Sequence, residues 1–229
     1  MNFILRLIDK KSLSILYLKM SKNSQNSLFP NYTLYISKIL KLVICSGSMK
    51  KESNEQMNKI VDIIATNIVK GAYESTLSLK KKILSEEELR TSLKIIFSKE
   101  TATSIIKFSE TILVKLDDFS AENKIKRISL PKTLEVFYPI KMLKNILLKL
   151  GKKNIKMSLN ADLYFITFMF YITHLILELS YNEASIWKRT RLGPRDILIG
   201  INGDEEFRAL FNKLDIYIDT KHYKYPYKG

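Results

Sequence analysis

Four clusters of basic side chains in this sequence have the chemistry to bind phosphate groups. They comprise Lys50 and Lys51; Lys80, Lys81 and Lys82; Lys152, Lys153 and Lys156; and Lys188, Arg189, Thr190 and Arg191, with Arg195 close behind. Lys and Arg gain affinity for nucleic acid by releasing counterions from its phosphates, so binding depends on salt but not on base sequence. Any single cluster is equally well explained as a solvated loop. The prediction of a phosphate-binding surface therefore depends on whether the fold gathers the clusters.

The composition is that of a folded protein with a polyanionic partner. With 229 residues, 46% of them apolar, the chain can fill a hydrophobic core. A net charge of +15 and a pI near 9.6 favour nucleic acid or an acidic membrane surface as the partner. One cysteine, Cys45, excludes an internal disulfide, and His174 and His222 alone make a zinc cluster implausible. Because no phosphate loop or nucleophilic set is present either, we expect no enzymatic activity, no metal and no cofactor.

Two apolar segments raise the question of a membrane. Residues 163–177 carry no charge, but a helix needs about 20 apolar residues to span a bilayer, so we expect a buried core helix there. Residues 1–20 resemble a signal peptide in hydropathy, but Arg6, Asp9, Lys10 and Lys11 interrupt them and no small-residue cleavage site follows. They either precede a true start at Met20 or form an amphipathic arm. We expect no membrane partner, and a membrane-surface protein that uses this arm is the weakest alternative.

The helices that must position the basic clusters follow from the spacing of apolar residues. The first half of the sequence predicts a short helix over residues 32–43, a long helix opened by Ser53 and Gln56 as a capping box, a third helix from a Ser85–Glu88 capping box to Phe97, and a fourth over residues 101–116. Lys80 to Lys82 fall in the loop after the long helix. The predicted order is short, long, short, with an extra helix.

The same pattern repeats after a polar linker. The second half predicts a short helix over residues 142–150, a long helix from Leu159 or Asn160 to about Trp187, a short helix from Gly193 to Ile201, and a last turn or two over residues 204–211. A unit of this kind cannot bury its long helix alone. Two such units in one chain can pair with each other.

Residues 176–207, ILELSYNEASIWKRTRLGPRDILIGINGDEEF, resemble histone 2A without a gap. The first half resembles histone 2B more weakly, through NYTLYISKILKLV, MNKIVDIIATNIVKGAYE, SEEELRTSLKIIF and SKETATSIIKFSETILVKL. Fusion in this order resembles the histone doublets of large DNA viruses. The resemblance implies an all-α protein with two histone folds, paired within the chain as a head-to-tail handshake heterodimer.

The resemblance also implies a division of the chain and a role for its residues. The expected parts are a disordered N-terminal arm (1–31), a histone 2B-like fold with a C-terminal helix (32–116), a linker (117–130), a histone 2A-like fold (131–218) and a short basic tail (219–229). In paired histone folds the first loop of each lies beside the second loop of the other. Lys50 and Lys51 should then meet residues 188–191, and Lys152, Lys153 and Lys156 should meet residues 80–82.

Individual residues take roles from the family only where they match it. Arg191 matches the arginine that histones insert into the minor groove, and Lys156 stands where the other loop has an arginine. The acidic patch that docks basic peptides is partly kept, by Glu100, Glu178, Asp204, Glu205 and Glu206, while Phe108, Phe170 and Leu175 replace its other carboxylates. We therefore expect weaker binding of arginine-anchored peptides.

The expected function is packaging of double-stranded DNA without sequence specificity, as the histone 2A/2B-like part of a nucleosome-like particle. The expected partners are DNA, histone 3- and histone 4-like proteins or a fused doublet of them, and a second copy of the chain in an octamer-like particle. The expected location is the nucleus, or a viral factory and the virion interior. The alternative is a histone-fold pair of transcription-factor subunits that binds promoter DNA.

Overall fold

The computed structural model describes residues 31–44, 47–122, 138–152 and 154–216, and this part of the chain is almost entirely helical. The first half holds α3 (Thr33–Val43), β1 (Ser48–Met49), α4 (Lys51–Ser78), β2 (Ile83–Leu84), α5 (Glu86–Ile96) and α6 (Lys99–Glu122). The second half holds α8 (Met142–Lys149), β3 (Lys156–Met157), α9 (Leu159–Ile186), β4 (Arg191–Leu192), α10 (Pro194–Gly203) and α11 (Glu205–Lys213). The predicted order of short, long and short helices is confirmed in both halves.

The two halves share one spacing. Residues 48, 51, 83 and 86 begin β1, α4, β2 and α5, and residues 156, 159, 191 and 194, each 108 positions later, begin β3, α9, β4 and α10. Both long helices have 28 residues. No insertion or deletion therefore separates the halves between the first strand and the second short helix, and residues 108 positions apart can be compared directly.

Several predicted boundaries are corrected by side-chain contacts. Ser53 does not cap α4, which begins two residues earlier, because its hydroxyl donates to the Leu192 carbonyl at 3.1 Å. Helix α9 begins at Leu159, one of the two predicted starts, and Ser158 caps it by accepting from the Ala161 N–H. The Ser85–Glu88 capping box is confirmed. Helix α6 runs six residues into the predicted linker, to Glu122, while the rest of the linker, nearly all of the N-terminal arm and the tail lie outside the described residues.

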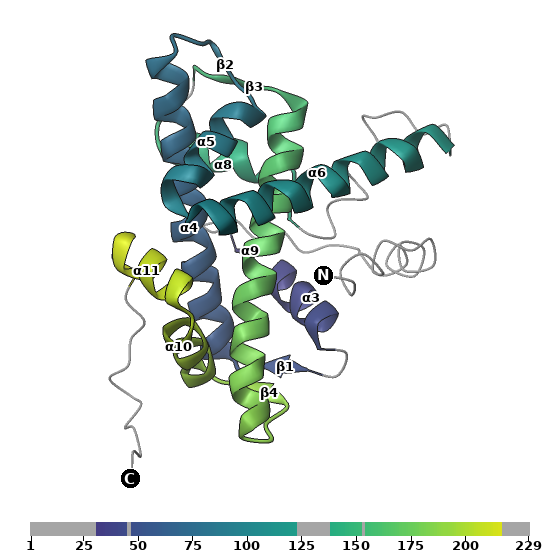
Figure 1. The fold of residues 1–229 in the computed structure, drawn as a ribbon, viewed down its shortest axis with the longest axis vertical. Helices are drawn as coiled ribbons and strands as arrows, with labels where there is room; N and C mark the ends of the chain where they lie inside the picture. The colour runs from purple at the N-terminus through teal and green to yellow at the C-terminus, as the bar shows by residue number, and fades with distance from the viewer. Residues whose placement is uncertain (1–30, 45–46, 123–137, 153, 217–229) are drawn as a thin grey trace.

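The core lies along the two long helices, with the shorter helices packed around them (Figure 1). Helix α4 buries one stripe that includes Met57, Ile60, Ile64 and Ile68. Helix α9 is buried more evenly, since α3, α5, α6 and α10 all contact it. Among the described residues, Asn160–Ile186 has the length and mean hydropathy, 1.5, of a membrane-spanning helix, but 78% of its most apolar stretch is buried inside the fold. Such burial is typical of a core helix.

Two short parallel strand pairs fix the relative direction of the long helices. Strand β1 precedes α4 and pairs with β4, which follows α9; β2 follows α4 and pairs with β3, which precedes α9. The long helices therefore run antiparallel, with one strand pair at each end (Figure 1). At about 1.5 Å per residue, 28 residues separate the two ends by about 42 Å.

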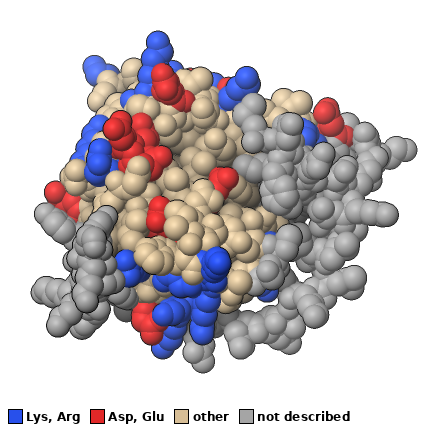
Figure 2. Space-filling model, turned by 60° about the horizontal axis from the view of Figure 1, so that its bottom comes forward, with Lys and Arg blue, Asp and Glu red and all other residues tan. Residues whose placement is uncertain are grey.

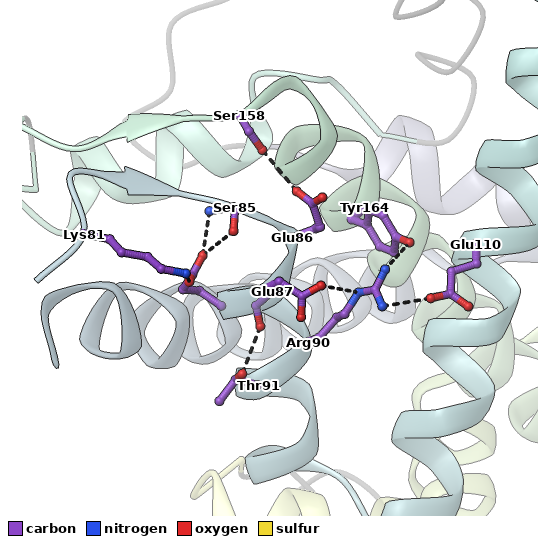
Figure 3. A network of polar contacts seen from close by, with 10 residues as sticks. Lys81, Ser85, Glu86, Glu87, Arg90, Thr91, Glu110, Ser158 and Tyr164 are labelled. Carbon is purple, nitrogen blue, oxygen red and sulfur yellow. Dashed lines mark hydrogen bonds and ion pairs between the residues drawn. The ribbon is translucent and has the colours of Figure 1, made fainter. Parts of the chain in front are cut away.

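A polar network holds the first half to α9 near β2 and β3 (Figure 3). The Arg90 guanidinium on α5 donates to the Tyr164 hydroxyl on α9 at 2.6 Å and pairs with Glu110 on α6 at 2.9 Å. It also lies over the Tyr164 ring, with its Cζ 4.9 Å from the ring centre. The Arg90 side chain thus links α5, α6 and α9 at the place where α6 crosses α9.

The first turns of α9 contain a carboxyl group that is poorly placed for ionisation. Burial raises the pKa of Asp162 from 3.8 to about 6, against the smaller opposing effect of Lys144. Its Oδ1 is buried without a hydrogen-bond partner among the described residues. At the equivalent position of α4 stands Asn54, whose amide donates to the Ser37 hydroxyl at 3.1 Å. The second half therefore buries a potential charge where the first half has a neutral amide.

Replacing Asp162 by asparagine should stabilise the protein at neutral pH. Because the folded state holds the Asp162 proton more tightly than the unfolded state, stability falls as the pH rises from about 4 to about 6. After allowance for partial solvent screening, we expect Asp162→Asn to raise the free energy of unfolding by about 1 kcal/mol near pH 7.5. The gain should be much smaller near pH 4. Urea unfolding at both pH values measures it, and equal gains at the two would contradict the explanation.

Candidate nucleic-acid interface

The β1–β4 edge, at the lower end of the molecule in Figure 1, joins the first loop of one half to the second loop of the other. The Ser48 N–H donates to the Thr190 carbonyl at 3.3 Å, and the Lys50 N–H donates to the Leu192 carbonyl at 2.9 Å. Figure 2, which brings this end forward, shows Lys and Arg gathered in the lower part of the view. The predicted residues that meet here are the exposed Lys50, Lys51, Lys188, Thr190 and Arg191 and the half-buried Arg189 and Arg195.

The β2–β3 edge joins the other two loops at the opposite end. The Lys156 N–H donates to the Lys82 carbonyl at 3.4 Å, and the Ser158 N–H donates to the Leu84 carbonyl at 3.0 Å. The Lys152 ammonium lies over the Tyr73 ring on α4, 4.8 Å from its centre. The predicted residues that meet here are Lys80, Lys81, Lys82, Lys152 and Lys156, all exposed, while Lys153 lies outside the described residues.

Each strand pair contains one cationic residue, which lies on β4 at one edge and on β3 at the other. At one edge Ser48 lies in register with Arg191, and at the other Lys156 lies in register with Ile83. Ile83 is the position equivalent to Arg191 and is 50% exposed. Both in-register cations therefore come from the second half, and only one of them is an arginine.

Two predicted phosphate-binding residues already hold a buried carboxylate. Lys81 pairs with Glu88 at 2.5 Å, and Arg189 pairs with Asp196. Glu88 is 1% exposed and Asp196 is fully buried. Each carboxylate also accepts the N–H of the residue before its helix, from Ser85 or Gly193, at 2.8 Å. Both pairs join residues seven positions apart, 108 positions from each other, so the second loop of each half is held by the same device.

The charge of Glu88 is maintained by these contacts. Burial alone would raise the pKa of this carboxyl, but hydrogen bonds from the Lys81 ammonium and from the Ser85 hydroxyl and N–H outweigh burial, so that the net pKa is lowered. An ionised Glu88 in turn draws the Lys81 ammonium inward. Lys81 and Arg189 thus shape the loops, and the other basic residues of each edge are freer to contact phosphate.

The loops turn sharply at equivalent lysines. Lys80 and Lys188 have φ of 53° and 52°, in the left-handed region that non-glycine residues seldom adopt. Each follows the C-terminal cap of a long helix, where a left-handed residue commonly ends a helix. Their charges lie close to the negative end of the helix dipole, which favours a cation there.

The predicted acidic residues are partly used inside the fold. Asp204 caps α11 by accepting from the Phe207 N–H at 2.9 Å, and Glu206 accepts from the Ser98 N–H, just before α6, at 2.8 Å. Glu205 is exposed, with 94% of its side chain accessible. Lys213, at the other end of α11, donates to the Ile95 carbonyl at 2.6 Å. Helix α11 therefore holds the second half against the α5–α6 turn. The carboxylates of Asp204 and Glu206, which accept backbone N–H groups, are then less available to an outside ligand.

Aromatic side chains occupy part of the predicted acidic patch. Phe108 on α6 stacks on Phe170 of α9, with ring centres 6.1 Å apart, and tilts against Tyr171 at 4.8 Å. Glu178 Oε2 lies 3.7 Å from Nδ1 of His174. Burial lowers the pKa of His174 despite this carboxylate, which acts to raise it. Glu100 is exposed at the start of α6. With Phe108 and Phe170 among its residues, the predicted acidic patch is less acidic than an unbroken cluster of carboxylates.

Known proteins similar to this chain include a histone 2A variant and a histone of known structure. The Z variant of histone 2A from Lodderomyces elongisporus is 31% identical over 80 residues, which make up 35% of this chain and 60% of that histone. The crystal structure of the histone from Methanopyrus kandleri covers 76% of this chain and 93% of its own, with 14% identity and a TM-score of 0.46. No family model matches the chain. The sequence similarity to a histone 2A variant supports a histone fold in the protein.

Proposed function

We propose that the chain is a histone doublet, a histone 2B-like unit followed by a histone 2A-like unit, that binds and wraps double-stranded DNA without sequence specificity. The observation that carries this proposal is the make-up of the two basic edges. Each edge consists of the first loop of one half and the second loop of the other, held by a strand pair. This is the arrangement expected of two histone folds in a head-to-tail handshake. Similarity to the Z variant of histone 2A over 80 residues supports the histone assignment.

The geometry suits a curved duplex. Two cationic edges about 42 Å apart on antiparallel helices can contact phosphates at two places along one DNA segment. Helix α4 begins at the β1–β4 edge and α9 at the β2–β3 edge, so their N-terminal N–H groups add to the favourable field for phosphate. Arg191 is the proposed minor-groove residue of one edge and Lys156 that of the other.

A histone 2A/2B-like unit needs companions to form a particle. We propose that histone 3- and histone 4-like proteins, or a doublet of them, and a second copy of this chain complete an octamer-like assembly. Because fusion in this order resembles the doublets of large DNA viruses, the packaged genome would be viral. The protein would then act in the nucleus, or in a viral factory and the virion interior.

Duplex binding by the edges should depend on Arg191 and on salt. Arg191→Ala should weaken binding to duplexes of any sequence and lower the slope of log affinity against log salt concentration by about one. Fluorescence anisotropy across a salt series measures both quantities. Lys70, exposed on α4 and eight residues before its last residue, lies outside both edges and gives the matched control Lys70→Ala. An equal loss in both variants would contradict an interface at the ends of the long helices.

A further inference from the structure

The β1–β4 edge carries an exposed tryptophan that phosphate binding does not explain. Trp187, the single tryptophan of the sequence, is the C-terminal cap of α9. It is 59% exposed, and Ile186 before it is 69% exposed. An indole ring offers a large flat apolar surface, which in a nucleic-acid-binding site can stack on a base.

The indole ring has a neighbour of defined chemistry. The Arg195 guanidinium of α10 lies over it, with its Cζ 5.7 Å from the ring centre. Helices α9 and α10 pack so closely that a Cβ on Gly200 would lie 2.8 Å from the Leu179 backbone. The ring directly follows α9 and the guanidinium belongs to α10, so two closely packed helices place them, and the exposure of Trp187 leaves ring surface open to solvent.

The β1–β4 edge that carries the ring holds further cations. Lys188 follows it directly, Arg191 lies three residues further on, and the Lys50 ammonium lies 3.9 Å from the position of a Cβ on Gly193. Within the described part of the chain, none of these three cations forms a salt bridge. A polyanion with flat aromatic groups would match both the charges and the ring. In duplex DNA the base faces are covered by neighbouring bases, whereas an unpaired base presents its face.

We propose that Trp187 and Arg195 form a stacking platform for an unpaired nucleobase, so that the β1–β4 edge binds single-stranded as well as double-stranded DNA. This inference rests on the proposed DNA-binding function of the same edge. The phosphates of the single strand would lie against Lys50, Lys188 and Arg191 while one base stacks on the open surface of the indole. Stacking of this kind tolerates any base, because every base has an aromatic face.

The opposite edge lacks the platform. The residues equivalent to Trp187 and Arg195, 108 positions earlier, are Leu79 and Glu87. Leu79 is 60% exposed but has no ring, and Glu87 repels phosphate. Single-strand binding should therefore be confined to the β1–β4 edge, and Leu79 provides a matched control at an equally exposed position.

The emission of Trp187 reports on its own contacts in the full-length protein. We would titrate it with oligothymidine, with an abasic strand of the same length, and with a relaxed closed duplex circle that has no ends. The proposal predicts that oligothymidine quenches the emission strongly, while the abasic strand and the circle bind with little quenching. Equal quenching by the abasic strand, or none by oligothymidine, would overturn it. Oligouridine in a parallel titration shows whether a ribose strand is held in the same way.

Variants separate this proposal from the proposed function. Trp187→Ala should lower the affinity for oligothymidine by about tenfold, Trp187→Phe should restore most of it, and Leu79→Ala should have no effect. Duplex binding should be unchanged in all three. If the wild-type protein did not bind the duplex, the proposed function would be refuted. If Trp187→Ala bound both the duplex and oligothymidine as well as the wild-type protein does, stacking alone would be refuted. A blue shift on phosphatidylserine vesicles without quenching by oligothymidine would replace stacking with membrane contact.

Discussion

Replacing Gly200 by alanine should lower the free energy of unfolding by about 3 kcal/mol. A Cβ at this position would lie 2.8 Å from the carbonyl carbon and oxygen of Leu179 and 2.9 Å from the nitrogen of Ser180. These are backbone atoms of the C-terminal third of α9, so the contact can be relieved only if α10 moves away. Thermal unfolding should show a fall in Tm of about 10 °C for a chain of this size.

The same helix supplies the control for Gly200. Gly203 ends α10, and a Cβ there would meet nothing within 4 Å. Gly203→Ala should therefore leave Tm nearly unchanged. If both variants were equally unstable, the cause would be the loss of glycine flexibility in α10 and not the close approach of two helices. In the first half the small residue lies on the opposite helix, since Gly71 of α4 faces Ser92 of α5.

Removing the Asp196 carboxylate should cost about 3 kcal/mol of stability and weaken duplex binding as well. Asp196 is fully buried, where it accepts from the Arg189 guanidinium and from the Gly193 N–H. Asp196→Ala would leave both donors without a partner, and the loss of one member of a buried pair is strongly destabilising. Because Gly193 directly follows β4, the loop that carries Arg191 would loosen. Urea unfolding and the salt-series anisotropy measure the two effects.

Arg189→Ala and the double variant complete a test of this pair. Strong coupling, in which the double variant is much less destabilised than the sum of the single variants, is expected. Glu205→Ala, which removes an almost fully accessible carboxylate, should leave stability unchanged. Additive effects of Asp196→Ala and Arg189→Ala would show that Arg189 is not held by Asp196, and would return Arg189 to the residues available for phosphate.

The helices could be predicted from the sequence because their apolar residues recur with the helical period. The start of α5 was also predictable, since the interactions of the Ser85 and Glu88 side chains within the described residues are with each other and with Lys81, which is close in sequence. The start of α4 was not, because the hydroxyl of Ser53 is bound by a carbonyl 139 residues away. Local signals therefore identify a cap only where no distant group competes for it.

The site was predictable as a set of clusters but not residue by residue. Charge alone makes Lys81 and Lys82 equivalent, yet only Lys81 faces the buried Glu88. A signal was present, because a cation lies seven residues before an acid at the start of the next helix in both halves. The 108-residue spacing aligns Lys81 with Arg189 and Glu88 with Asp196, and this shared pattern distinguishes the two loop-forming cations from the other basic residues. The exposure of Trp187 depends on packing and had no such signal.

Reconstitution of the full chain with histone 3- and histone 4-like partners on long DNA of mixed sequence, followed by nuclease digestion, tests the central claim most directly. A doublet that wraps DNA without sequence specificity predicts a ladder of regularly spaced protected fragments whose sequences are unselected. The ladder should be lost when Arg191 and Lys156 are both replaced by glutamate. Protection of one promoter sequence alone, without a ladder, would contradict packaging and favour a pair of transcription-factor subunits.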